Sequence, residues 1–112
     1  MGGVPSAATL PDPSAVCARF FQGLAHPVRL RIVLALLDGE KNVSELMELL
    51  RLRQSVVSNH LACLRWCGFV SARPEGRHVY YAVTDPRIRE IVRLAQAVVV
   101  EHAAHIAACP RL

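Results

Sequence analysis

The amino-acid sequence predicts a mainly α-helical domain that carries one small β-hairpin. Apolar residues make up 53% of the 112 residues but aromatic residues only 5%, so the core is built from Leu, Val, Ile and Ala. This composition favours helices over a β-sandwich or a barrel. Apolar side chains recur at helical spacing along most of the chain, and one stretch near residues 69–83 reads as two strands around a turn. A chain of this length forms one domain.

The first part of the chain predicts a tail and two helices. Residues 1–13 contain three prolines and two glycines without a periodic pattern, so we expect a disordered N-terminal tail. Ser14 can cap a first helix, which ends before the His26-Pro27 pair. Pro27 suits the first turn of a second helix, which is closed by Asp38-Gly39. His26 is interpreted as a cap or packing residue rather than a ligand.

Two further helices follow with a tight connection: one covers about residues 43–50, and the other begins at Gln54 and is closed by Gly68. Two short helices joined in this way form a helix-turn-helix, in which the second helix enters the major groove of DNA. Residues 69–73 and 78–83 predict the two strands of a wing, with turn residues at 74–76. The sequence therefore predicts a winged helix-turn-helix domain over residues 14–107, followed by a short tail at 108–112.

The final helix, which starts after Asp85-Pro86, carries more apolar side chains than packing against so small a body requires. They recur from Ile88 to Val99. An uncovered apolar helix face indicates a contact with another molecule. We therefore expect a homodimer that forms through the last helix together with the first.

Charge is distributed unevenly along the chain. Residues 1–50 carry four basic and five acidic side chains, whereas residues 51–93 carry eight arginines and three acidic side chains. The positive surplus lies on the predicted helix-turn-helix and wing, where binding to DNA phosphates requires it. This distribution of charge favours double-stranded DNA as the partner.

Apolar run lengths and cysteine usage predict the compartment. No apolar run approaches the roughly 18 residues that cross a bilayer, so no membrane partner is expected. The N-terminus lacks the charged region of a signal peptide, which predicts a cytoplasmic protein. Four cysteines in such a chain argue against a disulfide framework and leave metal binding, redox sensing or burial.

The helix that begins at Gln54 presents polar side chains in its first turns. Short polar groups of this kind suit base edges and phosphates. An enzyme site is not indicated, because Ser58 and His60 face different sides of the helix and no third orienting group accompanies them. The polar residues of this helix are Gln54, Ser55, Ser58, Asn59 and His60.

Four segments together resemble the ArsR/SmtB family of winged helix-turn-helix metalloregulatory repressors. LAHPVRLRI at 24–32 is similar to the family's LAxPxRLxIL segment, and QSVVSNHL at 54–61 to its QSxVSxHL segment. CGFV at 67–70 and GRHVYY at 76–81 fit its xGLV and GRxxxY segments. The agreement runs from about residue 18 to residue 95 in the right order and spacing.

The resemblance implies a homodimer that binds a palindromic operator and releases it when a metal or another inducer binds. It also implies that the polar residues just given, Gln54 to His60, lie in the major groove. The basic residues of the wing would contact phosphates. These wing residues are Arg73, Arg77 and His78.

Sensors of this family hold their inducers at different sites, and two of these sites find no complete match. The cysteine pair that some members carry before the recognition helix is absent from residues 45–49. A second site, on the last helix, has a late half in His102 and His105 but lacks an early histidine at 85–87. We therefore interpret His102 and His105 as auxiliary metal ligands or a solvated face. A histidine-only variant of this site, with Glu101, remains open.

A third site, that of the cadmium- and lead-sensing CmtR type, matches best. Its cysteine pair on the recognition helix corresponds to Cys63 and Cys67, and Cys109 is in a plausible place for its third ligand. Three thiolates suit large, soft cations, so Cd(II) or Pb(II) is the expected inducer, with Zn(II) and As(III) left open.

Other roles for the cysteines also remain open. The pair could be buried as small hydrophobic residues or could form a redox- or sulfide-sensing thiol site. Cys17 could pack within the first helix or join an arsenite-type site with cysteines of a second copy.

Overall fold

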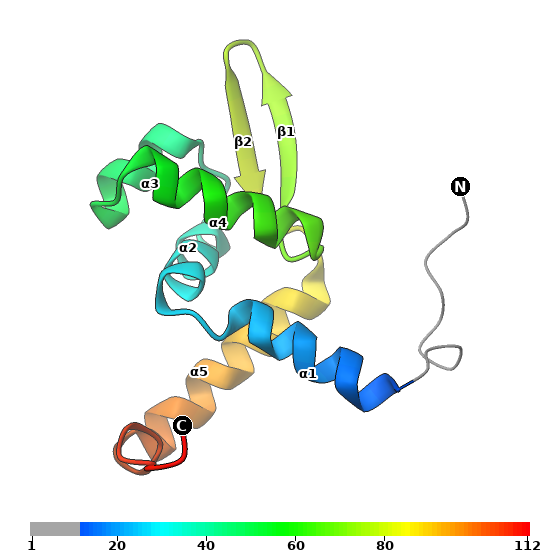
Figure 1. Ribbon diagram of the computed structural model, residues 1–112. Coiled ribbons are helices and arrows are strands. Elements are labelled where there is room, and N and C mark those ends of the chain that lie inside the picture. Colours follow the sequence, from blue (N-terminus) through cyan, green and yellow to red (C-terminus); the bar gives the residue numbers. More distant parts are fainter. Residues whose placement is uncertain (1–11) are drawn as a thin grey trace.

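The computed structural model describes residues 12–112, which form five helices and one two-stranded antiparallel hairpin (Figure 1). This confirms the predicted winged helix-turn-helix. The predicted disordered tail lies almost wholly outside the described residues. The elements in chain order are α1 (Pro13–Leu24), α2 (Pro27–Leu37), α3 (Val43–Leu50), α4 (Gln54–Trp66), β1 (Ser71–Glu75), β2 (His78–Ala82) and α5 (Pro86–Ala107).

The first helix begins earlier than the sequence suggested. Asp12, not Ser14, is its N-cap, because the Asp12 carboxylate accepts hydrogen bonds from the backbone N–H groups of Ser14 and Ala15, each at 3.1 Å. The prediction that Ser14 caps α1 was therefore wrong. The break at His26-Pro27 is confirmed, and Nδ1 of His26 caps α2 by accepting from the N–H of Val28 at 3.1 Å.

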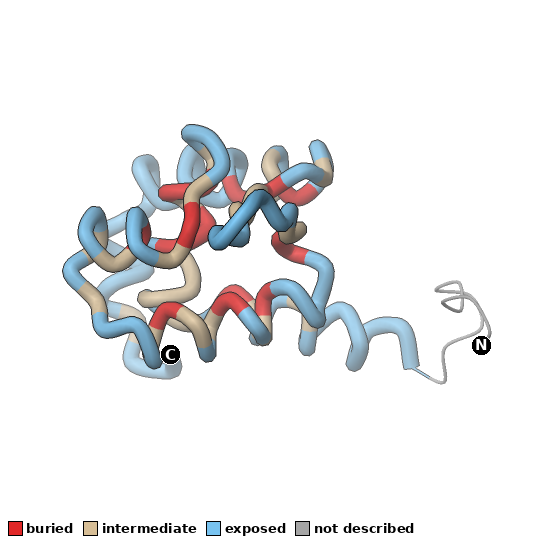
Figure 2. Tube along the Cα trace, turned by 90° about the horizontal axis from the view of Figure 1, so that it is seen from above, coloured by how far each residue is buried: buried red, intermediate tan, exposed pale blue. Residues whose placement is uncertain are grey.

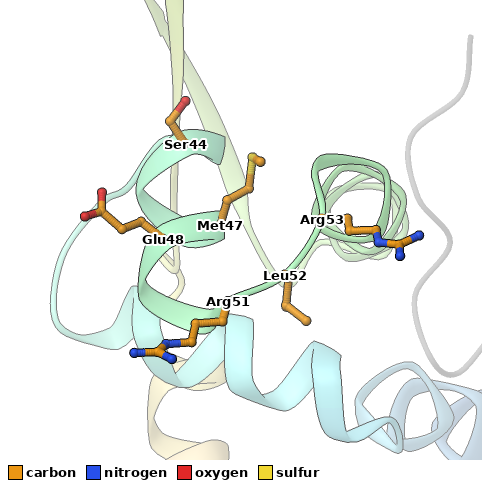
Figure 3. Close-up of a pocket in the computed structure, with 6 residues that line it drawn as sticks. All are labelled: Ser44, Met47, Glu48, Arg51, Leu52 and Arg53. Atoms are coloured by element: carbon orange, nitrogen blue, oxygen red, sulfur yellow. The ribbon is translucent and has the colours of Figure 1, made fainter.

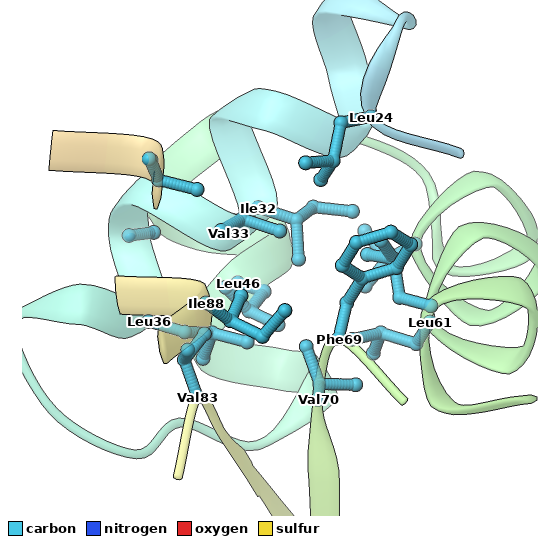
Figure 4. Close-up of a cluster of buried hydrophobic side chains, with 14 residues drawn as sticks. Leu24, Ile32, Val33, Leu36, Leu46, Leu61, Phe69, Val70, Val83 and Ile88 are labelled. Carbon is cyan, nitrogen blue, oxygen red and sulfur yellow. The ribbon is translucent and has the colours of Figure 1, made fainter. Parts of the chain in front are cut away.

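The core forms where α2 meets the other helices, and Figure 4 shows its side chains converging from several elements. The members that are almost fully shielded from solvent come from α2, α3 and α4, and from the segment before the hairpin. Figure 2 shows the buried positions within the helical body, whereas the start of α1 and the last part of α5 are exposed. The largest of these side chains are Phe69, Ile32, Leu36, Leu46, Leu61 and Leu64.

The wing begins later than predicted. Phe69 and Val70 are buried in the core, and β1 starts only at Ser71. Pairing then continues through Pro74 and Glu75, which face Val79 and His78, so the predicted turn at 74–76 was too early.

An additional bridge ties the wing to the helical body. The N–H of Lys41 donates to the carbonyl of Tyr81 at 3.0 Å, and the N–H of Tyr81 donates back at 2.8 Å. This reciprocal pair fixes β2 beside the segment that leads into α3, so the hairpin has a defined position relative to the helix-turn-helix.

The last helix leaves the body soon after it starts. Asp85 caps α5, and Ile88 and Val92 are buried, but every residue from 93 to 108 is exposed (Figure 1). An apolar groove of about 410 Å³ lies between α1, α2 and this exposed part, with Phe21, Leu34 and Val99 among its lining residues. The expected surplus of apolar surface on α5 is thereby confirmed for the single chain.

Helix length and composition give no single membrane span among the described residues. The α1–α2 pair, bent by 79°, passes the same criteria only when taken together. In α2, four apolar residues (Ile32, Val33, Ala35 and Leu36) are buried in the core of the domain.

Candidate DNA-reading surface and thiol pair

The two sides of α4 differ sharply. Val57, Leu61 and Leu64 are buried at helical spacing and attach the helix to the core. On the opposite side, Ser55 and Asn59 are exposed; Gln54 is exposed as the first residue of the helix, and Ser58 is half-buried. Four of the five predicted groove residues therefore stand on or beside the outer side of one helix.

The N-terminus of α4 also suits a negatively charged ligand. Its N-cap residue, Arg53, makes no side-chain capping bond, and no acidic side chain lies in the first turn. The free N–H groups and the positive end of the helix dipole at such a terminus favour phosphate. The start of the helix is thus a favourable place for an anion.

Two arginines that the sequence analysis did not single out flank this terminus. Arg51 and Arg53 border a hollow of about 540 Å³ between α3 and α4, and Figure 3 shows their side chains pointing to opposite sides of it. Arg51 adopts the left-handed conformation, with φ of 55°, that turns the chain between the two helices. Their place in the tight turn just before Gln54 was the available sequence signal.

His60 lies apart from the other predicted groove residues. Its Nδ1 accepts a hydrogen bond from Nε of Arg29 at 3.1 Å, and its ring centroid is 4.5 Å from that of His26. Burial first, and then the charges of His26 and Arg29, lower the pKa of His60 below its usual value. The structure therefore joins His60 to the start of α2.

The basic residues of the wing fall into two groups. Arg77 and His78 are exposed at the end of the hairpin. Arg73 instead forms ion pairs with Glu40 at 2.6 Å and Glu75 at 3.3 Å. The bond from Arg73 also lowers the pKa of Glu40, so this pair is charged at neutral pH. Glu40 is 33 residues away in the chain, and no local pattern pointed to it.

The two thiols of α4 lie one turn apart at its C-terminal end. The N–H of Cys67 donates to the carbonyl of Cys63 at 3.0 Å. Burial, followed by the charge of Cys63, raises the pKa of the Cys67 thiol. Cys67 also borders a hollow of about 440 Å³ that Arg19 and Phe20 of α1 line from the other side.

The donor set of this pair fits a soft cation only in part. All four cysteines are free, and two neighbouring thiols are suitable ligands for a soft metal once they lose their protons. Within residues 12–112 of a single chain, however, no three His, Cys, Asp or Glu side chains are close enough to hold an ion together. The described part of the chain thus supplies two soft ligands at this place.

The remaining candidate ligands lie elsewhere. Cys109 follows the end of α5, half-buried, and borders a hollow of about 560 Å³ together with His105. His102 and His105 are both exposed, and the backbone at His102 is non-helical, with φ of −119°. Cys17 is exposed on α1. The structure thus places Cys109 and the two histidines at one end of the molecule and the thiol pair of α4 at another element.

The helix-turn-helix, the wing anchored beside it and the polar outer side of α4 together define a winged helix-turn-helix DNA-binding protein. The chain belongs to the ArsR family of bacterial regulatory proteins, whose family model matches residues 26–72.

Three similar proteins support this assignment. A protein from Streptomyces lividans, named "Probable mercury resistance operon repressor", is 41% identical over 104 residues, which cover 93% of this chain and 81% of that protein. The HTH-type transcriptional regulator CmtR of Mycobacterium tuberculosis is 49% identical over 82 residues, which cover 72% of this chain and 70% of the relative.

The third is a solved structure, the homodimeric winged helix-turn-helix DNA-binding domain Mb0332 from Mycobacterium bovis. It is 29% identical and has a TM-score of 0.76 over 91% of this chain and 92% of that one. These relatives are transcriptional regulators, and this chain is accordingly a DNA-binding transcriptional regulator and not an enzyme.

Proposed function

We propose that the protein is a homodimeric repressor that binds a palindromic operator and releases it when a thiophilic metal binds. The observation that carries this proposal is the pair of thiols at the end of the helix that presents the polar side chains. Cys63 lies in α4 with Ser55 and Asn59, and Cys67 is the C-cap of the same helix, so a displacement of the thiols would shift the DNA-reading turn.

Cys63, Cys67 and the Cys109 of a second copy are the proposed metal ligands. The absence of a third ligand near the pair in the described part of a single chain supports a site shared between two copies. The exposed apolar side of α5 supports the dimer, because Val98 and Val99 are about half exposed (53% and 46%) in one chain. His102 and His105, on the same helix, are proposed as auxiliary ligands.

Sulfur ligands determine which cations the site would prefer. Three thiolates favour large, soft cations, which supports Cd(II) and Pb(II). The Streptomyces lividans relative is named as a probable mercury resistance operon repressor, so Hg(II), a cation of the same soft class, is a further candidate inducer. Zn(II) usually takes a fourth ligand, which one of the two histidines could supply, and As(III) accepts three thiolates.

The geometry also suggests how binding would affect DNA. Thiolates drawn toward a residue of a second copy would tie the end of α4 to the neighbouring α5. That tie favours one orientation of α4 over another, and a ligand that distinguishes two orientations shifts the equilibrium between them. The operator requires both copies of α4 in register with two half-sites, so a modest rotation lowers affinity.

Wing and turn contribute the contacts to the DNA backbone in this proposal. Arg77 and His78 contact phosphates from the hairpin. The N–H groups at the uncapped N-terminus of α4 bind a further phosphate. Gln54, Ser55, Ser58 and Asn59 face the base edges.

Fluorescence anisotropy of a labelled palindromic fragment from the protein's own promoter region tests the proposal. We expect salt-dependent binding by a dimer and release on addition of cadmium, lead or mercury, but not of magnesium. Binding that is unaffected by every soft metal would contradict it.

A redox or sulfide sensor is the rival function for the same fold. The raised pKa of Cys67 disfavours it, because a reactive thiol is usually one with a lowered pKa. Cα atoms four residues apart in a helix lie about 6 Å from each other, but the directions of their side chains strain a disulfide. A loss of two mass units after mild oxidation in the absence of metal, together with operator release, would favour the rival.

A further inference from the structure

His60 occupies a position on α4 that differs from that of the residues around it in the sequence. It precedes Cys63 and Cys67 by three and seven residues, so it lies on the same side of the helix as the thiols. This side faces α1 and α2, because His60 bonds to Arg29 and Cys67 borders a hollow together with Phe20. Asn59, its immediate neighbour, is exposed, whereas His60 is half-buried. A side chain in this place points away from the surface that would enter the groove.

Arg29 joins three elements at this point. Its Nε donates to Nδ1 of His60 at 3.1 Å, and its Nη1 donates to the carbonyl of Gly23 in the last turn of α1 at 3.3 Å. Because Arg29 itself belongs to the first turn of α2, a single guanidinium connects the α1–α2 junction to α4.

The surroundings of this contact leave little freedom for it to shift. His26 lies against His60 while its own Nδ1 accepts the N–H of Val28, so its ring is fixed by the start of α2. On the α1 side, a Cβ at Gly23 would meet Cε2 of Phe69 at 2.8 Å, which shows how closely α1 approaches the core here. The α1–α2 junction that carries Arg29 is therefore closely packed, and the bond from Arg29 to His60 has a defined geometry.

We propose that Arg29 and His60 form a positioning pair, which fixes the DNA-reading turn of α4 against the α1–α2 junction without itself contacting a base. This inference rests on the proposed DNA-binding function and refines it, because it removes His60 from the set of groove residues. The role requires an acceptor at the position of Nδ1 and a donor at the position of the Arg29 guanidinium, and it requires nothing that recognises a particular base pair.

Substitutions that keep or remove the acceptor test the pair. In His60→Asn, the side-chain oxygen can take the place of Nδ1, so operator affinity should stay within about threefold of the wild type. In His60→Leu and in Arg29→Met the bond is lost, and affinity should fall about tenfold or more. The double variant should be no weaker than the weaker single variant, because both changes remove one interaction.

The base preference separates positioning from reading. A set of operators, each with one base pair changed, is titrated with the wild type, with His60→Leu and with Asn59→Ala as the matched control. We expect His60→Leu to weaken binding to all operators by a similar factor, and Asn59→Ala to flatten the preference at one base position. A preference lost at one position in His60→Leu, or an unchanged affinity, would overturn the inference.

The wild-type protein supplies a readout that does not depend on any variant folding. Nitrogen NMR of the His60 ring in the free protein and in the operator complex should show Nδ1 as an unprotonated acceptor in both. A new hydrogen bond from the His60 ring to DNA in the complex would contradict the proposal. If the wild type binds no operator at all, the proposed function is wrong. If the wild type binds normally and His60→Leu binds equally well, the proposed function stands and only this inference is wrong.

Discussion

The guanidinium of Arg73 lies 2.6 Å from the carboxylate of Glu40, and this ion pair connects the first wing strand to the segment between α2 and α3. The same guanidinium is 5.2 Å from the ring centroid of Tyr80 on the opposite strand. Glu75, at 3.3 Å, is its third partner, so Arg73 is held in the middle of β1, whereas Arg77 is exposed at the end of the wing.

Glu40→Gln should increase the salt dependence of operator binding. Removing the negative charge frees Arg73 for a phosphate, and each additional phosphate contact steepens the slope of log K against log salt by about 0.9. Arg77→Ala should make the slope shallower by a similar amount. Anisotropy titrations at several salt concentrations measure both. An unchanged slope in Glu40→Gln would show that Arg73 stays at the base of the wing in the complex.

Cadmium affinity should rise with pH between about pH 6 and pH 8. Burial and the neighbouring Cys63 raise the pKa of Cys67, so this thiol is protonated at neutral pH and must lose its proton when it binds a metal. Each thiol proton released gives up to about a tenfold change in affinity per pH unit. Competition titrations with a chelator at fixed pH values measure this dependence.

Cys17→Ser is the matched control, because it removes an exposed thiol that lies outside the pair. It should leave both the affinity and its pH dependence unchanged. A pH-independent affinity in the wild type would mean that the pair is not the ligand.

Stability should decrease as the pH falls below about 6.5, the ordinary pKa of histidine. The folded protein lowers the pKa of His60, so the unfolded chain binds more protons than the folded one in this range. The contribution of His60 is therefore fully present above pH 6.5 and is lost as the pH falls through its folded value. Urea denaturation at pH 7.5 and pH 5.5 should show a larger loss for the wild type than for His60→Asn. Equal losses would contradict the assignment.

Val99→Asp should convert the proposed dimer to a monomer. Val99 lines the apolar groove between α1, α2 and α5, and a carboxylate there would have to be buried without a partner on association. Val79→Asp, on the wing, is the control and should leave the dimer intact. Sedimentation velocity distinguishes the two states. A dimeric Val99→Asp variant would show that the dimer interface does not include this groove.

The fold was predictable because its signals are local. Helical spacing, the proline after His26 and the turn chemistry near Gly76 each act within a few residues, and they located every helix and the hairpin. The cap of α1 was misassigned although Pro13, at the first helical position, favours the residue before it as the cap. The wing was placed too early because apolar Phe69 and Val70 fit a strand pattern equally well, and only the tertiary core shows that they pack before β1 begins.

The candidate site was less predictable, since its contacts join residues that are distant in the chain. The motif at 54–61 grouped His60 with the exposed polar residues, but its partner Arg29 is 31 positions away. Glu40 and Arg73 are separated by 33 positions. The spacing of Cys63 and Cys67 is local and predicted that both thiols lie at the end of one helix, where Cys63 is in α4 and Cys67 is its C-cap. The proposed role of Cys109 depends on a second copy, which no local pattern describes.

The central claim is that the thiol pair of α4 controls operator binding. The most direct test titrates the reduced wild type and Cys63→Ser with cadmium while thiolate-to-metal absorbance and operator anisotropy are recorded in the same sample. We expect saturable absorbance with parallel release of DNA in the wild type, and neither in Cys63→Ser, which should still bind the operator. Release of DNA by cadmium in Cys63→Ser, or absorbance without release in the wild type, would contradict the claim.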